Sequence, residues 1–350
     1  MGRFEFNYPQ LVLAGLTAVT IIAIVVAAST SSAAFGSYND AWDGASELRE
    51  QARAVDTESE LVRNTSRYTT VAPNGTLGVV LSPESAYGPA ETDRLRSFVR
   101  DGGTLVVAED FGQHANGLLD RLGADARVTG QVLRDEQYNY QSPALPVARN
   151  VSNHTLTQGV DGITLNHGSA VAPNGARVLA NTSGVAYVDI NRNAELDDRD
   201  RVGTSPVATI ESVGDGRVVV VGDPSSFINT MLDRPGNQAF VGSLFDSHQQ
   251  VLLDYSHAGR LPPLSVALLV LRDTPLIQGL LGVVGITIIG FVARRPDVLR
   301  RTRDRIGPNE NASPTPGPAE LSSFVNERHP DWDDERVDRV IQGIMARRDE

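Results

Sequence analysis

Oxygen-bearing side chains recur at regular spacing in residues 189–200, which read DINRNAELDDRD. They occupy positions 1, 3, 5, 7, 9 and 12 of this twelve-residue stretch, which is the spacing with which calcium loops surround a hard cation. The candidate ligands are Asp189, Asn191, Asn193, Glu195, Asp197 and Asp200. Ala194 stands where such loops usually have Gly, and Asp200 stands where they usually have Glu. The stretch predicts a structural Ca²⁺ site, and a solvated acidic hairpin loop is the alternative.

A second group of polar side chains follows two apolar runs, 104–108 and 217–221, that are expected to be buried parallel strands. The carboxyl ends of parallel strands form the edge at which open α/β sheets bind ligands. The weak catalytic candidates at this edge are Glu109, Asp110, His114, Asp223 and Ser225.

These candidates support two interpretations. Ser225, His114 and Asp110 can be arranged as a nucleophile, a base and an orienting acid. Alternatively, Asp223 caps the start of a helix, because Pro224 behind it suits the first helical position. The second interpretation assigns no catalytic residue, and the sequence favours it.

Composition excludes several classes of function. The 350 residues contain no Cys, so disulfides, thiolate metal sites and Cys nucleophiles are all excluded. All 31 basic residues are Arg, against 43 acidic residues, and a net charge of −12 predicts no nucleic-acid binding. The sequence has neither a P-loop nor a Gly-x-Gly-x-x-Gly motif, so we expect no nucleotide.

The elements that must position these residues are expected to include both helices and strands. The apolar run 76–81, the amphipathic stretch 91–100, the Gly102-Gly103 stop and the run 104–108 predict a right-handed βαβ crossover. Further helices are expected at 40–55, 115–122 and 236–256. Short strands are expected at 67–71, 126–133, 163–165, 177–181, 185–190 and 207–212.

Three blocks of sequence carry a resemblance to a known family: YNDAWDGASELRE (38–50), PAETDRLRSFVRDGGTLVVAEDFG (89–112) and GDGRVVVVGDPSSFINTMLDRPGNQAFVGSL (214–244). They resemble an uncharacterised family of archaeal and bacterial membrane proteins with a class I glutamine-amidotransferase-like domain. The blocks are also similar to the substrate-domain subunit of gliding-type ABC systems. The resemblance implies a flavodoxin-like three-layer α/β sandwich, here with a β-rich insertion. True glutaminases of that superfamily need a Cys, which this chain lacks.

Two apolar segments, 11–28 and 276–293, are long enough to predict transmembrane helices. Residues 294–305 contain six Arg and two Asp, which places the C-terminal side in the cytoplasm. The expected parts are a cytoplasmic N-terminus (1–10), a transmembrane helix (11–28), an external α/β domain (29–270), a second transmembrane helix (276–293), a basic segment with a Pro-rich linker (294–318) and a cytoplasmic helical tail (319–350). Cleavage of the first segment as a signal peptide is the alternative.

The acidic charge of residues 29–270 and the apolar stripe of the tail give further expectations about source and partners. Residues 29–270 contain 29 acidic residues and 18 Arg, a net charge of −11, which suggests a halophilic archaeon as the source. The apolar stripe of the tail, at 337–345, predicts a protein partner; the alternatives are that the two tail helices pack on each other or lie on the membrane. The preferred function is a non-catalytic, membrane-anchored domain for binding or scaffolding. The alternatives are a Ser- or carboxylate-dependent hydrolase acting on envelope glycans or peptides, and an accessory subunit of an ABC-type transporter.

Overall fold

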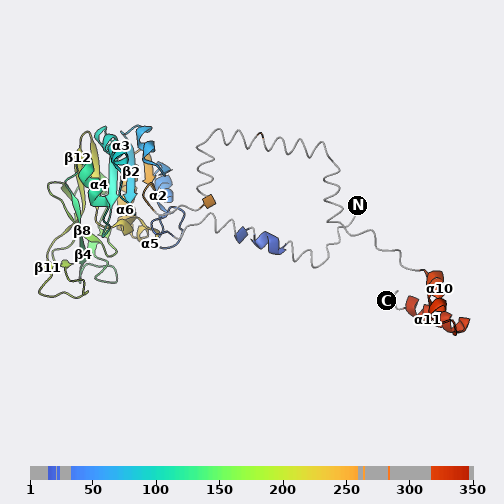
Figure 1. Cartoon of the computed structure of the whole chain (residues 1–350). Coiled ribbons are helices and arrows are strands. Elements are labelled where there is room, and N and C mark those ends of the chain that lie inside the picture. The colour runs from blue at the N-terminus through green and yellow to red at the C-terminus, as the bar shows by residue number, and fades with distance from the viewer. Residues whose placement is uncertain are drawn as a thin grey trace. The chain divides into compact units, whose positions relative to one another are not determined.

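The computed structural model describes residues 15–20, 22–23, 33–258, 263–264, 283 and 317–346. The chain divides into two compact units, Met1–Val270 and Leu271–Glu350. The first unit is a mixed α/β fold with more than one sheet, and the described part of the second is a helical hairpin. Figure 1 shows the strands and helices of the first unit.

The largest sheet has eight strands in the order β1-β14-β2-β3-β13-β12-β9-β6. Its first five strands run parallel, and the last three pair antiparallel. The strands are β1 (Glu58–Val62), β14 (Gln250–Asp254), β2 (Thr76–Leu81), β3 (Thr104–Ala108), β13 (Gly216–Val221), β12 (Pro206–Val213), β9 (Arg177–Asn181) and β6 (Asn150–Val151). All residues of β2 and β3 are buried, as expected of parallel strands covered on both faces.

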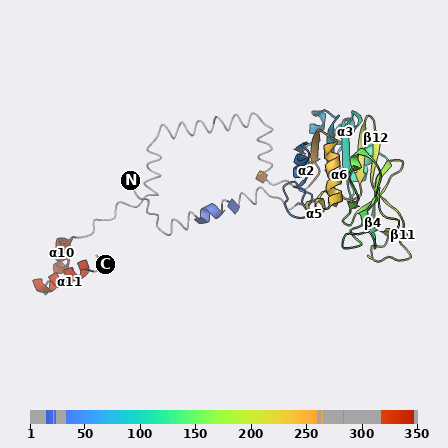
Figure 2. The same ribbon diagram turned by 180° about the vertical axis from the view of Figure 1, so that it is seen from behind.

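Helices cover both faces of this sheet. On one face α3 (Pro89–Arg100) and α4 (Ala115–Leu122) pack over Leu105, Val218 and Val220. On the other face α2 (Leu48–Ala54) and α6 (Pro235–Asp246) pack over Val79 and Val219. Accordingly, α4 lies in front of the sheet in Figure 1, and α6 lies in front of it when the view is reversed in Figure 2.

A smaller sheet has four strands, and along the chain all of them lie between β3 and β13, which are neighbours in the main sheet. Its order is β11-β10-β4-β8, with β11 (Arg201–Val202), β10 (Tyr187–Asp189), β4 (Arg127–Arg134) and β8 (Ser169–Ala172). Two short strands, β5 (Val147–Ala148) and β7 (Ile163–Thr164), form a separate pair. The backbone N–H of Ser169 donates to the carbonyl of Gly222, so β8 is joined to the carboxyl end of β13. In Figure 1, β4 and β11 lie beside and below the main sheet.

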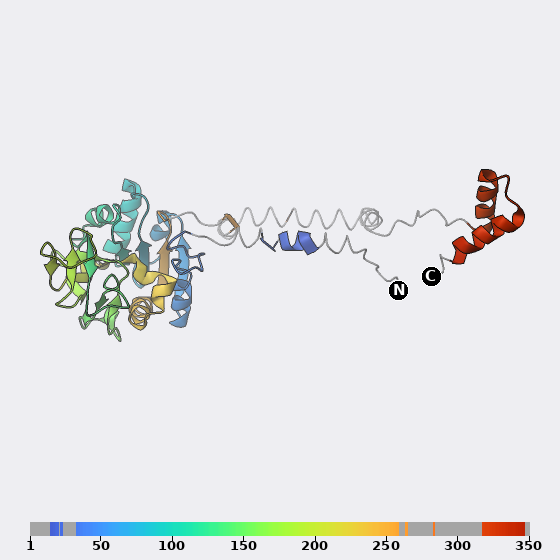
Figure 3. The ribbon, with the colours of Figure 1, turned by 90° about the horizontal axis from the view of Figure 1, so that it is seen from below.

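Single turns of helix connect some of these strands. They are η1 (Thr65–Thr69), η2 (Thr155–Thr157), η3 (Pro224–Phe227) and the short α5 (Asn229–Leu232). The helical hairpin of the second unit consists of α10 (Pro318–Arg328) and α11 (Asp334–Ala346), whose pairing is visible in Figure 3. Val337 and Ile341 of its apolar stripe are buried, whereas Ile344 is exposed. The protein partner predicted for this tail stays a prediction.

The predicted fold class with two transmembrane helices is wrong. Within the described residues, no helix has the length and apolarity needed to cross a bilayer. The two-span localisation with an external main domain is corrected with it, whereas the bilayer as a partner stays a prediction. Most of 11–28 and 276–293, and all of the basic segment 294–305, lie outside the described residues.

Several element predictions are also corrected. The helix expected at 236–256 ends at Asp246, and residues 250–254 form strand β14 instead. The helix expected at 40–55 is reduced to α2, and the strand expected at 67–71 is largely the 3₁₀ turn η1. In contrast, β2, β3, α4 and β9 have the residue ranges that the sequence predicts.

Candidate functional site

The register of the parallel strands aligns three residues at one edge of the sheet. Leu81 of β2 pairs with Ala108 of β3, and Ala108 pairs with Val221 of β13. The next residue of each strand is therefore at the carboxyl edge: Ser82, Glu109 and Gly222. Backbone hydrogen bonds hold this alignment, from Ser82 N to Ala108 O (2.9 Å) and from Glu109 N to Val221 O (3.0 Å). We call Ser82, Glu109, Asp110 and Asp223 the carboxyl-edge cluster.

Glu109 is 1% exposed, although it directly follows a strand end. Its Oε1 accepts hydrogen bonds from the backbone N–H groups of Asp110 and Gly112, each at 2.9 Å. Its Oε2 is buried and has no hydrogen-bond partner among the described residues. Burial raises the pKa of Glu109, the two N–H donors partly oppose this, and the neighbouring Asp110 carboxyl raises it further. A Cβ at position 112 would overlap this carboxyl group, so only Gly allows so close an approach.

Asp223 is fully buried and joins three segments of the chain. Its Oδ1 accepts from Ser225 N (2.7 Å) and so caps η3, while its Oδ2 accepts from Asn166 N (2.6 Å) in the inserted region. Burial raises its pKa to about 7; the two N–H donors lower it, and Asp110 raises it. The capping role expected from Asp223-Pro224 is confirmed, with a 3₁₀ turn as the capped element.

Ser82 is a member of this cluster that the sequence did not indicate. Its φ is +38°, an unusual conformation for a residue other than Gly, and such conformations concentrate at functional sites. Its hydroxyl donates to Glu109 Oε1 over 3.4 Å. The only sequence signal was its place between a buried strand and Pro83, which is equally typical of an ordinary strand end.

The structure does not assemble the relay of Ser225, His114 and Asp110. His114 precedes α4 at its N-cap position and makes no capping hydrogen bond through its side chain. Among the described hydrogen bonds, none joins His114 to Asp110 or Ser225. Asp110 accepts instead from the backbone N–H of Phe111 (2.6 Å), and its carboxyl is partly exposed. The arrangement therefore lacks the hydrogen-bonded base that a serine nucleophile needs.

A second polar cluster at the carboxyl end of β14 also escaped sequence analysis. Asp254 is buried and accepts from Tyr68 Oη (3.0 Å) and Ser256 Oγ (2.6 Å). Ser256 Oγ also lies 3.0 Å from Nδ1 of His257, whose Nε2 is 3.2 Å from Glu91 Oε2. Burial raises the pKa of Asp254, and the Ser256 and Tyr68 donors oppose this. These bonds tie the segment that follows β14 to α3.

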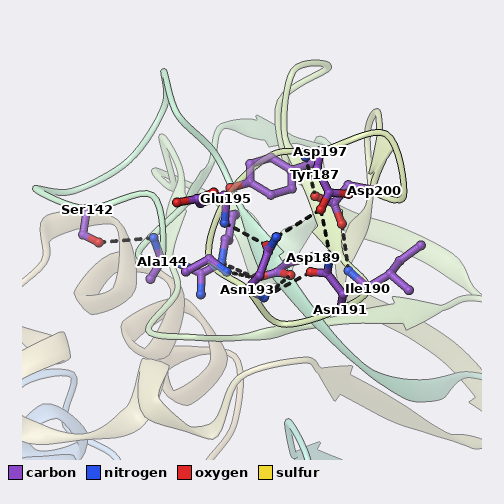
Figure 4. A network of polar contacts seen from close by, with 12 residues as sticks. Ser142, Ala144, Tyr187, Asp189, Ile190, Asn191, Asn193, Glu195, Asp197 and Asp200 are labelled. Atoms are coloured by element: carbon purple, nitrogen blue, oxygen red, sulfur yellow. Dashed lines mark hydrogen bonds and ion pairs between the residues drawn. The ribbon is translucent and has the colours of Figure 1, made fainter.

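The predicted calcium loop is organised by its own side chains (Figure 4). Asp189, at the end of β10, accepts from the backbone N–H groups of Asn193 (3.2 Å) and Ala194 (3.1 Å). Asp200 accepts from Ile190 N and Asp197 N, both at 3.0 Å. The amide nitrogens of Asn191 and Asn193 both donate to Asp197 Oδ2. The loop therefore folds around its carboxylates, as the two sequence interpretations both allow.

The side-chain oxygens of residues 189–200 are ligands of the kind that Ca²⁺ prefers, but some of them already contact other groups of the protein. Arg134 Nε forms an ion pair with Asp189 Oδ2 at 2.7 Å, within a partly buried contact. Burial acts to raise the pKa of Asp189, but this arginine and the loop N–H groups hold it below its usual range. No group of three or more His, Cys, Asp or Glu in the described part of the chain is arranged to hold a metal ion. Calcium binding by residues 189–200 stays a prediction.

Comparisons with solved structures return only distant similarities. The mmIFT52 N-terminal domain is 17% identical, with a TM-score of 0.41, and the match covers 53% of this chain and 80% of that one. A putative ThuA-like protein from Bacteroides uniformis ATCC 8492 is 16% identical, with a TM-score of 0.33 and coverages of 59% and 87%. The exo-beta-1,4-mannosidase Op5Man5 from Opitutaceae bacterium strain TAV5 is 20% identical, with a TM-score of 0.28; the match covers 49% of this chain and a quarter (25%) of that enzyme.

No curated protein matches the chain. A family model does match, over residues 37–245, and its description is "Domain of unknown function (DUF4350)". The matched range contains β2, β3 and β13 with the whole carboxyl-edge cluster, and it ends shortly before β14. The protein therefore belongs to the DUF4350 family.

Proposed function

We propose that the α/β domain is a non-catalytic binding module that takes a cationic group of its ligand or partner at the carboxyl-edge cluster. The observation that carries the proposal is the buried Oε2 of Glu109, for which the described part of the chain supplies no hydrogen-bond partner. A buried carboxyl oxygen without a partner is costly to the fold. A ligand that donates a hydrogen bond there would remove that cost on binding.

Charge at this edge favours a cation. Asp110 is partly exposed beside Glu109, and its carboxyl acts on both Glu109 and Asp223. Phe111 is 38% exposed, and the guanidinium of Arg192 lies 5.1 Å from its ring centroid. Because aromatic faces attract cations, this edge already accommodates one arginine of the protein itself. An amine or guanidinium ligand fits the same chemistry.

The contacts of the carboxyl groups support binding without catalysis. Glu109 Oε1 and both oxygens of Asp223 accept hydrogen bonds from backbone N–H groups. We infer in addition that the domain is amidotransferase-like, as the three blocks of sequence suggest. The chain has no Cys, so the nucleophile of glutaminases is missing in any case.

The test measures the melting temperature of the full chain with the tripeptide Gly-Arg-Gly and with spermidine. We expect both cations to raise it saturably, and Gly-Glu-Gly to have no effect. Asp110→Asn is expected to weaken the apparent affinity about tenfold, as the loss of one charge-assisted hydrogen bond implies. Asp101→Asn, an exposed carboxyl after α3, is the matched control and should bind like the wild type. Equal shifts in both variants would exclude the cluster as the site.

A hydrolase is the second candidate, because Ser82 combines a strained backbone with a hydroxyl 3.4 Å from a carboxyl of raised pKa. In such a reaction the Ser82 hydroxyl attacks an acyl carbon and gives its proton to Glu109. Glu109 then passes the proton to the leaving group, and water releases the acyl group from the serine.

A serine-directed fluorophosphonate probe decides between the two candidates. A hydrolase would be labelled as wild type and Ser225→Ala, and the label would be lost in Ser82→Ala. Because the non-catalytic proposal is preferred, we expect no labelling of any of the three proteins. Labelling that depends on Ser82 would contradict that preference.

A further inference from the structure

A polar cleft of about 520 Å³ lies at the amino ends of the parallel strands, away from the carboxyl-edge cluster. The charged and polar residues in its wall are Asp125, His154, Arg177, Glu211, Ser212 and Arg217. They come from β9, β12, β13 and two loops, so the fold must form before the cleft exists. Its volume is within the range of small-molecule sites, about 300–1,000 Å³.

Strand register places the two arginines on one face of the sheet. Arg177 of β9 pairs with Ile210 of β12, and Arg217 of β13 pairs with Ser212 of β12. Ile210 and Ser212 are two residues apart on one strand, so their side chains point to the same side. The side chains of Arg177 and Arg217 therefore share that side as well.

The acid between them points the other way. Glu211 alternates with Ile210 and Ser212, and its two oxygens accept from Asp125 N (2.7 Å) and Ala126 N (2.9 Å) on the opposite face. Glu211 is thus held away from the arginines, although it borders the cleft. The remaining acid of the wall, Asp125, is exposed to solvent.

The arginines create a positive potential inside the cleft. Burial lowers the pKa of His154, and the charges of Arg177 and Arg217 lower it further. Burial also lowers the pKa of His248, at the end of α6; its bond to the Leu244 carbonyl opposes this, and Arg217 adds to the lowering. The charge of Arg217 therefore acts on two histidines from different elements.

Arg217 has no acidic partner in the described part of the chain, and the same holds for most arginines of this domain. Arg67, Arg127 and Arg134 form ion pairs with Glu60, Asp120 and Asp189. Arg177 donates to the carbonyl of Asn153 (2.8 Å). Neither arginine of the cleft is therefore neutralised by an ion pair with an acid among the described residues.

We propose that this cleft binds an oxyanion, a phosphate or sulfate group of a small ligand, between Arg177 and Arg217 with His154 beside it. The guanidinium fork pairs with two oxygens of such a group at once. Of the two acids in the wall, Glu211 is held by the backbone N–H groups of Asp125 and Ala126, and Asp125 is exposed. His154 Nδ1 accepts from the backbone N–H of Leu156 (3.1 Å), so Nε2 is the ring atom left to contact the anion. The site is separate from the carboxyl-edge cluster, and either proposal can fail without the other.

The test follows the ring resonances of His154 by NMR in the full chain, with inorganic phosphate as the probe. The resonance is assigned by its absence in His154→Gln. We expect millimolar phosphate to shift it saturably and to raise the pKa of His154, because a bound anion offsets the arginine charges. Inorganic sulfate, acetate and chloride at equal ionic strength distinguish a phosphate or sulfate site from general screening.

Arginine variants locate the site. Arg217→Gln and Arg177→Gln are each expected to weaken the apparent phosphate affinity at least about tenfold, a loss of about 1.4 kcal/mol. Arg201→Gln is the control, because Arg201 is exposed on β11 and donates to Gln131 outside the cleft. The proposal is overturned if phosphate and chloride act alike on His154, or if Arg217→Gln and Arg201→Gln respond equally. The melting temperature of each variant confirms that it folds.

Discussion

Truncation of Phe227 to alanine is expected to lower the free energy of unfolding by about 3–5 kcal/mol, the usual cost of deleting a buried aromatic ring. Phe227 is fully buried in the core that α2 and α6 form with the sheet. It ends η3, the turn that Asp223 caps. Chemical denaturation of the full chain, with two-state behaviour checked by two probes, measures the loss.

Phe111→Ala is the matched control at the same edge of the sheet. Its ring is 38% exposed and contacts Arg192, so its removal is expected to cost less than about 1 kcal/mol. Since Phe111 offers its face to a cation, the same variant is expected to weaken binding of Gly-Arg-Gly. Equal destabilisation by the two substitutions would contradict the placement of Phe227 in the core.

The stability of the protein is expected to fall as the pH rises from about 4 to about 7, because Asp223 is buried. Its pKa is raised from 3.8 to about 7 in the folded chain. Between these values the folded state keeps a proton that the unfolded state has lost, so unfolding becomes easier with rising pH. A shift of about 3 units corresponds to about 4 kcal/mol in all, and this stability is fully present only below pH 4.

Asp223→Asn isolates this contribution. Glu109 and Asp254 have raised pKa values and act in the same direction, while the lowered pKa of Asp189 acts in the opposite one. These three groups are the same in wild type and variant, so their contributions cancel when the free energies of unfolding of the two proteins are subtracted at each pH. We expect the pH dependence to become shallower in Asp223→Asn and to be unchanged in Asp161→Asn, which alters an exposed carboxyl. Equal slopes in all three proteins would show that Asp223 is ionised in the fold.

The sequence predicted an element correctly where the residues of that element alone determine its type. The apolar runs of β2 and β3 and the Gly102-Gly103 stop between them gave the βαβ unit, because burial on both faces leaves no polar position. Strand β14 was read as a continuation of α6, since Val251 and Leu252 keep helical spacing from Phe240 and Leu244. A short buried strand cannot be separated from a buried helix by periodicity alone; here pairing with β1 and β2 decides it.

The site residues also divide into those that local sequence signals located and those that depend on backbone conformation or strand pairing. Glu109 and Asp223 were found because each follows a strand whose carboxyl end the sequence locates. Ser82 was missed because its positive φ leaves no trace in residue type. Arg177 and Arg217 are 40 residues apart, and only antiparallel pairing through β12 brings them to one cleft. Asp254 and His257 were hidden by the wrong helix assignment.

Hydrogen exchange of the full chain, with and without Gly-Arg-Gly, tests the central claim most directly. The account predicts slower amide exchange on binding in residues 82–87, 109–114 and 222–228, the three loops at the carboxyl edge. In Asp110→Asn the same protection is expected to need about tenfold more peptide. The segments 150–158 and 210–217 around the arginine cleft should exchange as before. Protection confined to those segments, or no protection at a concentration that saturates the thermal shift, would contradict a binding site at the carboxyl-edge cluster.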